Sequence, residues 1–566
     1  MTKTALLLSS ILLLLPALAA AAPRCDDLKV PAAPASFDAF RSAVAGSLRQ
    51  AGDEATAAQV EALAPGRAVP AENAALASCL LRRYIVARFG DRIVSDLQEM
   101  VAFRTFAEEG KENWGLPELA RQRDWLRSKA EGLGLAFKDY DGRMDEITLP
   151  GGPAPILAVL THGDVQDVQN QQWSSPPWEG KLVGDRIIGR GTEDDKGPIV
   201  ASLYSMAALR DTGWPLGMTV RLLVANGEES SWDEIPYYLE RAPKPDMTFG
   251  IDAAYPVVHA QKGYGVLTLR GRGMGTTAAK PKRKDWWIVE MSGGSGMSII
   301  PERGEAVLEA GRYPEGAIAY LKKQAAEWSA AHPPARLTVT HEPGDRFHVI
   351  AEGKGGHSSE PHSGHNALAD LTAFLATLDL KMDAHGALAA FLASTLKTET
   401  DGRGLGVATH DEGIGDLTVN LSFLREQEGV PVAEVNLRVP RGISNEEVQR
   451  RVEEKAAAFQ KSTGAVIEVE SKRMSEPHWA PPEGKLVASL LGVWEEVTGK
   501  PGKPIAIGGG TQARLFPGGV DFGPALDMEH YRGHGTDEYL TVDELHRIAE
   551  LTVAAFWRLA SPAGTF

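Results

Sequence analysis

Three short apolar runs in this 566-residue chain each end in ionisable side chains. PILAVLT leads directly into His162 and Asp164, VRLLVANG is followed by Glu228 and Glu229, and DMTFGI is followed by Asp252. Stretches with helical spacing, such as KGPIVASLYSMAALRDTG, lie between these runs. Alternating strands and helices predict a largely parallel sheet with helices on both faces. Because the carboxyl ends of such strands meet at one edge of the sheet, we expect these side chains to converge.

A further acidic segment, GRGTEDDKG, places Asp194 and Asp195 at the start of the next predicted helix. Several carboxylates repel one another in a small site unless cations lie among them. The histidine at the first strand end favours zinc over magnesium or calcium. Each motif alone is typical of a structural pair or a helix cap. The ordered combination predicts a divalent metal site at this edge of the sheet.

The predicted pattern of helices and strands changes twice along the chain. Residues 263–475 read as strands with few helices, which is an α+β pattern, and the helix–strand pattern returns near residue 484. We therefore expect an α/β domain formed by residues 91–262 and 476–566, interrupted by an inserted α+β lid domain. Residues 23–90, rich in Ala, Glu, Arg and Gln, predict a helical N-terminal extension.

The N-terminus, MTKTALLLSSILLLLPALAAAAPRC, has the features of a secretory signal peptide spanning residues 1–22. Its apolar run is too short to cross a bilayer, and we expect no membrane span elsewhere. The mature protein would be secreted or periplasmic. In an oxidising compartment Cys25 and Cys79 are most simply one disulfide, with two unrelated thiols as the alternative.

The charge of the chain argues against a nucleic-acid partner. The formal net charge is -16, whereas the phosphate backbone rewards clustered Lys and Arg. One short basic run, KPKRK at 280–284, is predicted to be a solvated loop.

The motifs together resemble a known family. They are HGDV at 162–165, GRGTEDDKG at 189–197, NGEES at 226–230, IDAAYP at 251–256, GGHSSEPHSGHNA at 355–367, GGGTQAR at 508–514 and HGTDEY at 534–539. The family is that of the two-zinc exopeptidases, which includes carnosinase, dipeptidase V and carboxypeptidase G. The resemblance covers about residues 91–566. It is greatest to dipeptidase V, in the long lid and in IDAAYPVVHAQKG.

The resemblance implies a ligand set for two Zn²⁺ ions per chain, with Mn²⁺ or Co²⁺ left open. Asp194 would bridge both ions, His162 and Asp252 would complete one, and Glu229 and His534 the other. It also implies a cis peptide bond between Asp194 and the next residue. The charges are consistent with this set: two dications bring four positive charges, three carboxylates return three, and a bridging hydroxide supplies the fourth.

The resemblance also implies the groups that act beside the ions. Glu228 would be the general base, since adjacent side chains diverge and its neighbour is a ligand. Asp164 would accept a hydrogen bond from the far nitrogen of His162 and fix its tautomer. His357, in the lid, would donate a hydrogen bond to the developing oxyanion.

A carboxylate site completes the implied machinery. Arg438 would hold the free carboxylate of the substrate by a bidentate pair, and backbone N–H groups of Gly509, Gly510 and Thr511 could bind the same group. Ser298 stands where dipeptidase V has an asparagine in the lid, so the grip on the substrate there is expected to differ.

These roles predict hydrolysis of the amide bond of dipeptides or short peptides with a free C-terminal carboxylate. An N-acyl amino acid deacylase using the same site is the alternative that the sequence leaves open. A non-enzymatic binding protein would have lost a ligand or the base, and none is missing. A two-metal phosphoesterase is disfavoured because no Lys- or Arg-rich phosphate clamp lies near the ligands. The inserted segment, about 210 residues long, is long enough for two lobes, so we expect a monomer.

Overall fold

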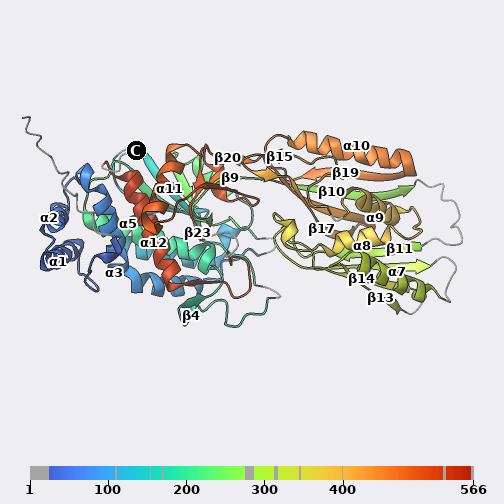
Figure 1. Cartoon of the computed structure of the whole chain (residues 1–566), viewed down its shortest axis with the longest axis horizontal. Coiled ribbons are helices and arrows are strands. Elements are labelled where there is room, and N and C mark those ends of the chain that lie inside the picture. Colours follow the sequence, from blue (N-terminus) through green and yellow to red (C-terminus); the bar gives the residue numbers. More distant parts are fainter. Residues whose placement is uncertain are drawn as a thin grey trace, which may run out of the picture.

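Two halves that lie end to end make up the molecule (Figure 1). The computed structural model describes residues 25–108, 111–152, 154–168, 171–274, 286–310, 316–342, 346–397, 399–526 and 531–562. The two largest buried cores are separate: one draws on residues before 258 and after 479, and the other on residues 267–467. The middle of the sequence is therefore inserted as a second folded half, which we call the lid.

The first half is built on a nine-stranded sheet in the order β1-β2-β6-β3-β7-β22-β9-β20, with β21 paired to β9. Its centre is parallel, because β3 pairs in parallel with both β6 and β7, and β7 with β22. The edge strands β1, β2 and β20 pair antiparallel. The strands are β1 (Ala136–Tyr140), β2 (Met144–Leu149), β3 (Ile156–His162), β6 (Thr219–Ala225), β7 (Met247–Gly250), β9 (Val257–Gln261), β20 (His478–Trp479), β21 (Pro504–Ile507) and β22 (Val520–Asp521).

Helices cover both faces of this sheet, as predicted. On β3, Leu157 and Val159 belong to the core beneath α3 (Ala74–Val101), α5 (Gly197–Thr212), α11 (Lys485–Thr498) and α12 (Val542–Ala560). The alternate residues Ala158 and Leu160 pack instead with Ile235 and Tyr238 of α6 (Glu234–Leu239). This alternation follows from the two-residue period of a strand, and it leaves β3 buried along its whole length.

The lid is built on an eight-stranded antiparallel sheet in the order β13-β14-β12-β11-β17-β18-β10-β19. Helices α7 (Ala317–Ala331), α8 (Ala367–Leu375), α9 (Ala384–Thr395) and α10 (Asn445–Thr463) pack on it. The strands are β10 (Gly263–Met274), β11 (Trp286–Gly293), β12 (Arg303–Ala310), β13 (Arg336–Glu342), β14 (Arg346–Glu352), β17 (Thr418–Gln427), β18 (Val430–Val439) and β19 (Ala465–Lys472). The fold class expected from the sequence, a parallel-centred α/β half interrupted by an α+β lid, is thus confirmed. The basic run at 280–284 lies outside the described residues.

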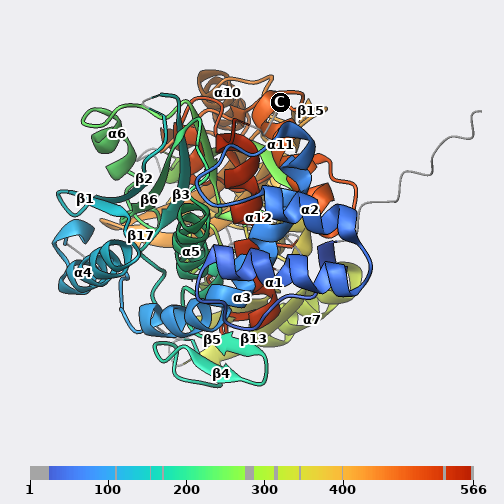
Figure 2. The ribbon, with the colours of Figure 1, turned by 90° about the vertical axis from the view of Figure 1, so that its left-hand side faces the viewer.

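The N-terminal segment is helical and packs on the first half. Helix α1 (Phe37–Gln50) packs on α3 and α5 and against α2 (Glu54–Ala62), and both helices face the viewer in the end view (Figure 2). Helix α3 is continuous through residue 90, where the sequence suggested a break between the extension and the next helix. Residues 1–24, which carry the predicted signal peptide, lie outside the described part of the chain.

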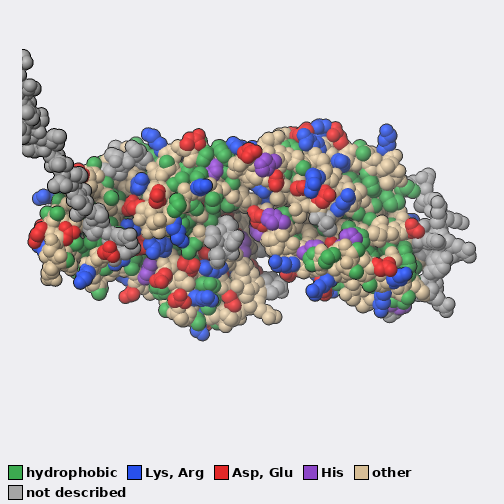
Figure 3. Space-filling view, viewed as in Figure 1, with side chains coloured by type: hydrophobic (Ala, Val, Ile, Leu, Met, Phe, Trp, Pro, Cys, Tyr) green, Lys and Arg blue, Asp and Glu red, His purple; other side chains and the backbone are tan. Residues whose placement is uncertain are grey.

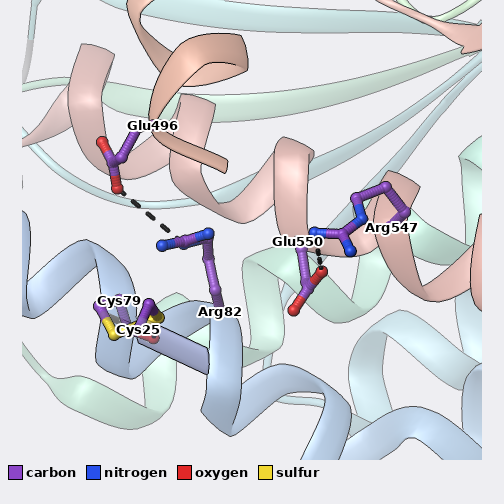
Figure 4. Close-up of a disulfide and its surroundings, with 6 residues drawn as sticks. All are labelled: Cys25, Cys79, Arg82, Glu496, Arg547 and Glu550. Carbon is purple, nitrogen blue, oxygen red and sulfur yellow. Dashed lines mark hydrogen bonds and ion pairs between the residues drawn. A yellow bond between two sulfur atoms is a disulfide. The ribbon is translucent and has the colours of Figure 1, made fainter. Parts of the chain in front are cut away.

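Cys25 and Cys79 form a disulfide that ties the start of the described chain to α3 (Figure 4). The bond closes a loop of sequence separation 54. Closing a loop of this length restricts the unfolded chain and contributes about 4 kcal/mol in the chain-entropy description. Beside it, the buried Arg82 lies 3.9 Å from Glu496 of α11, so the extension also meets the C-terminal segment through charge. Within the described residues, no helix combines the length and the apolarity needed to cross a bilayer.

Candidate active site

The predicted ligands come from the ends of adjacent parallel strands. His162 is the last residue of β3 and lies beside Ala225 of β6, so Glu228 and Glu229 follow β6 at the same level. Asp252 follows β7, whose Gly250 lies beside Leu160. Asp194 precedes α5, and His534 lies on the loop before β24 (Tyr539–Thr541). We call the five predicted ligands, His162, Asp194, Glu229, Asp252 and His534, the ligand cluster.

Asp194 lies between two histidines. One carboxylate oxygen is 2.7 Å from Nε2 of His162, and the other is 3.0 Å from Nε2 of His534. Oε1 of Glu229 is 2.8 Å from the same nitrogen of His534, and Oδ1 of Asp252 is 3.6 Å from Nε2 of His162. The structure therefore brings all five members of the ligand cluster together, and the peptide bond between Asp194 and Asp195 is cis, as the resemblance implied.

The donor set fits divalent cations. One ligand atom each from His162, Asp194 and Glu229 lie within 4.8 Å of one another, and so do atoms from His162, Glu228 and Asp252. Imidazole nitrogen with carboxylate oxygen is a set typical of zinc and similar ions. Burial raises the pKa of Asp252 to about 6, and burial followed by the charge of Asp252 raises the pKa of Glu228 well above its usual value. Cations at the cluster would relieve this crowding of acids.

Asp164 fixes the orientation of His162 in a different way from the one expected. Nδ1 of His162 donates to the main-chain carbonyl of Asp164 at 2.9 Å, while the Asp164 carboxylate is 3.6 Å from that nitrogen. The carboxylate instead accepts the backbone N–H groups of Glu228 and Glu229, each at 3.1 Å. The prediction of a carboxylate–imidazole bond is therefore corrected. Asp164 still directs the lone pair of Nε2 toward the cluster, and it also orders the loop that carries both glutamates.

Glu538 binds the loop that carries Asp194, and sequence reasoning gave it no role. Its side chain is fully buried and accepts the backbone N–H groups of Gly191 (3.1 Å), Glu193 (2.9 Å) and Asp194 (3.1 Å). The Arg190 guanidinium pairs with the same carboxylate at 2.6 Å. A second nitrogen of Arg190 donates to the carbonyl of His534 at 3.1 Å. Arg190 and Glu538 thus join the two loops that present Asp194 and His534.

Tyr531 is a second residue that sequence reasoning missed. Its hydroxyl donates to Oδ2 of Asp194 at 2.5 Å, the oxygen that also faces His534. Glu538 could have been noticed within HGTDEY, which was already matched as a motif. Tyr531 lies outside all the motifs that resemble the family, so no local sequence pattern indicated a role for it.

His357 lies on the lid loop that follows β14, with Nδ1 occupied. That nitrogen accepts the backbone N–H of Ser359 at 3.2 Å and lies 2.6 Å from the hydroxyl of Ser359. The proton of the neutral ring is therefore on Nε2. Burial, followed by the positive charges of Arg438 and His534, lowers the pKa of His357 to about 4. At neutral pH the side chain is a neutral ring that can donate one hydrogen bond from Nε2.

Arg438 is buried without a carboxylate partner among the described residues. Its side chain donates to Asn436 (3.1 Å), Ser298 (3.1 Å) and, more weakly, the carbonyl of Gly508 (3.4 Å), and it lies 4.9 Å from the ring centre of Tyr264. All of these partners are neutral. Burial lowers the pKa of Arg438 to about 10, so it stays charged at neutral pH. An unpaired buried guanidinium is suited to bind an anion from solution.

The glycine-rich segment at residues 508–514, which we call the glycine loop, agrees only in part with the predicted carboxylate site. The backbone N–H of Thr511 donates to Gln261 at 3.0 Å, and its hydroxyl donates to Asp521 at 2.8 Å, so Thr511 has no free donor for a substrate. A side chain built at Gly509 would meet only one atom, 4.0 Å away, whereas at Gly510 it would clash with Arg514 at 2.7 Å. Thr511 is therefore corrected to a residue that holds the loop in place, whereas the substrate-binding roles of Gly509 and Gly510 stay predictions.

The two halves touch beside this loop. A side chain at Gly508 would lie 2.8 Å from Cβ of Ser359, two residues after His357. The molecule narrows between the halves, and histidine side chains gather near the narrowing (Figure 3). The lid loop is thus held close to the half that carries the ligand cluster.

Comparison with known proteins adds a family assignment to this geometry. The sequence profile of "Peptidase family M20/M25/M40" matches residues 158–558. The matched region begins in β3 and ends in α12, so it contains the ligand cluster and the whole lid.

Curated relatives and solved structures match over most of the chain. A putative dipeptidase, YtjP of Bacillus subtilis, is 29% identical over 84% of this chain and 98% of its own length. A Beta-Ala-Xaa dipeptidase of Lactobacillus delbrueckii subsp. lactis is 28% identical over 80% of this chain and 93% of its own. The crystal structure of human carnosine dipeptidase 1 has a TM-score of 0.50 at 14% identity and covers 84% of this chain and 97% of that one. This structural likeness shows a shared fold.

Proposed function

The chain belongs to peptidase family M20/M25/M40, and from this membership we propose that it is a two-metal dipeptidase. The observation that carries the proposal is the position of Asp194, with one oxygen 2.7 Å from His162 and the other 3.0 Å from His534. A carboxylate placed in this way can bridge two ions. The matched relatives are named as dipeptidases, which favours dipeptides over N-acyl amino acids as substrates.

We assign the ions to the residues as follows. His162 and Asp252 would hold one ion, Glu229 and His534 the other, and Asp194 both, with zinc as the expected metal. Two bound divalent ions would activate the attacking water and polarise the carbonyl of the scissile bond.

The remaining groups act on the substrate and its protons. Glu228 would take a proton from the attacking water and deliver it to the leaving amine. His357 would donate its Nε2–H to the carbonyl oxygen as negative charge develops there. Arg438 would bind the C-terminal carboxylate of the substrate, which sets the distance from the chain end to the cleaved bond.

A substrate panel combined with metal exchange tests this function. Purified protein would be assayed on dipeptides, tripeptides and N-acetyl amino acids, then after chelation, and again after zinc is returned. We expect dipeptides to be cleaved fastest, activity to be lost on chelation, and zinc to restore it, with about two equivalents bound. Cleavage that survives complete metal removal, or cleavage of N-acetyl amino acids alone, would contradict the proposal.

We also propose that the protein is exported and acts as a monomer. The disulfide between Cys25 and Cys79 is the kind of bond that persists in oxidising compartments, which supports export after removal of residues 1–22. N-terminal sequencing of the mature protein and light scattering of the purified chain test the two statements. A retained leader or a stable dimer would contradict them.

A further inference from the structure

A second buried cation lies close to Arg438 and has no role in the function proposed above. Lys262 is 7% exposed and Arg438 is 5% exposed. Among the described residues, no carboxylate oxygen lies within 4.0 Å of the charged nitrogens of either side chain. We call Lys262 and Arg438 the cation pair. Lysine and arginine are rarely buried to this extent unless an anion balances them.

The two cations flank the same glycine loop. The backbone N–H of Lys262 donates to the carbonyl of Ile507 at 3.1 Å, and its own carbonyl accepts from Arg514 at 3.0 Å. Arg438 donates to the carbonyl of Gly508, the next residue of the loop, at 3.4 Å. Lys262 joins β9 of the first half to β10 of the lid, whereas Arg438 lies on β18 of the lid. The backbone of Lys262, at the junction of the halves, and the side chain of Arg438, on the lid, therefore contact the same loop.

The acids nearest to Lys262 do not neutralise it. The negative charges of Glu360 and Asp416 favour the charged form of Lys262. Both residues are exposed on the lid, however, and neither carboxylate lies within 4.0 Å of the Lys262 ammonium. Burial and the positive charge of Arg438 disfavour the charged form and lower the pKa of Lys262. Arg514, on the glycine loop, adds a further positive charge near Arg438. The described residues thus place several positive charges, and no acid in ion-pair contact, around the cation pair.

One substrate carboxylate cannot balance this site. A C-terminal carboxylate bound at Arg438 brings one negative charge, and the ammonium of Lys262, on which the charge of Arg438 acts, keeps its own charge unbalanced. A C-terminal residue with an acidic side chain brings two negative charges within one residue. The four-carbon stem of lysine carries a flexible point charge that can reach side-chain carboxylates of different lengths.

We propose that Lys262 binds an acidic side chain on the C-terminal residue of the substrate, so that the enzyme prefers dipeptides ending in Asp or Glu. The inference rests on the proposed dipeptidase function and adds the substrate class. Arg438 binds the α-carboxylate in this arrangement, and Lys262 binds the side-chain carboxylate.

Pairs of isosteric substrates test the proposal without any mutation. The ratio of kcat/KM for Ala-Asp over Ala-Asn, and for Ala-Glu over Ala-Gln, would be measured in the wild-type protein. We expect each ratio to be about tenfold or more, because a hydrogen bond to a charged group contributes about 1.5–3 kcal/mol. A ratio near one overturns the inference and leaves the dipeptidase function intact. Failure to cleave any dipeptide overturns both.

Substitution of Lys262 then locates the preference. We expect Lys262→Met to bring both ratios to about one, and Lys262→Arg to keep most of the preference. The matched control is Lys244→Met, at an exposed lysine between α6 and β7, which should leave the ratios as in the wild type. Unchanged ratios in Lys262→Met, or an equal loss on acidic and neutral substrates, would show that Lys262 does not read the side chain. Thermal melting confirms that each variant is folded.

Discussion

The two halves of this molecule carry opposite unpaired charge where they meet. The first half collects the acids of the ligand cluster together with Glu228, and the buried Arg190 near them is paired with another acid, Glu538. The lid and its junction present the cation pair, for which the described residues supply no acid. One side is short of cations and the other is short of anions. On the function proposed above, metal ions would complete the first half and the charged end of a substrate would complete the second.

This difference between the halves predicts two kinds of effect from mutation. Changes in the first half should reduce the rate of bond cleavage whatever the substrate, because they affect the ions and the proton transfer. Changes in the lid should depend on the substrate, because they affect the groups that the substrate itself brings. Because the two halves have separate cores, we expect that side chains on one side can be altered without unfolding the other. The following variants test this division, beginning with the largest effect.

Glu228→Ala should have the largest effect on turnover. General acid–base catalysis contributes about 10²–10⁴-fold, so we expect kcat to fall by that factor on every dipeptide while both ions stay bound. Stopped assays with excess enzyme, together with metal analysis, measure the two quantities. Because Glu228 also lies within reach of His162 and Asp252, a parallel loss of one ion would show that it is a ligand instead. Glu240→Ala, at an exposed glutamate that ends α6, is the matched control.

His357→Gln should come next and should act on kcat. Losing one donor to a developing oxyanion costs about 10²–10³-fold in kcat. The pKa of about 4 means that His357 is already neutral above about pH 5, so the pH profile from pH 6 to 9 should keep its shape in the variant. A profile that loses an ionisation in this range would contradict a neutral donor. His362→Gln, at an exposed histidine of the same loop, should behave as the wild type.

Arg438→Ala tests the lid, and its effect should depend on the substrate. We expect KM to rise about 10- to 100-fold for dipeptides with a free carboxylate, from the loss of about 1.5–3 kcal/mol of charged hydrogen bonding. C-terminally amidated substrates, which never had this contact, should change little. Equal effects on free and amidated substrates would remove Arg438 from this role. Arg425→Ala, at a partly exposed arginine of β17 paired with Glu434, controls for general damage to the lid sheet.

Much of the site could be predicted because its signals are local. Strand ends, helix starts and short motifs predicted that His162, Asp194 and Glu229 lie together, as they do, since each position is set by the element next to it in sequence. Hydrogen bonds between residues far apart in sequence could not be predicted in this way. The donor to Asp164 is the backbone of a loop 64 residues away, and the N–H of Thr511 is taken by Gln261, 250 residues away. Backbone groups are the same in every residue, so the sequence carries no trace of which side chain will bind them.

Glu538 is the clearest case of such a missed contact, and it supplies the smallest predicted effect. Glu538→Gln keeps the size of the side chain but turns an amide NH₂ toward backbone N–H donors and removes the charge that pairs with Arg190. The loop that carries Asp194 should then be held less firmly against the loop that carries His534. We expect zinc affinity, measured by competition with a chromogenic chelator, to fall about tenfold, as is common when a partner behind a metal ligand is changed.

The control and the substrate dependence decide whether Glu538 acts by position. Glu496→Gln alters a glutamate on α11 that lies 3.9 Å from Arg82 (Figure 4). The same glutamate lies 3.6 Å from Arg558. It should leave zinc affinity unchanged. If Glu538→Gln instead lowers the melting temperature without changing zinc affinity, the residue only stabilises the fold. Because Glu538 belongs to the first half, its effect at saturating zinc should be the same for free and amidated substrates, opposite to that of Arg438→Ala. A dependence on the substrate carboxylate would mean that the two halves are coupled through the loop at residues 531–538.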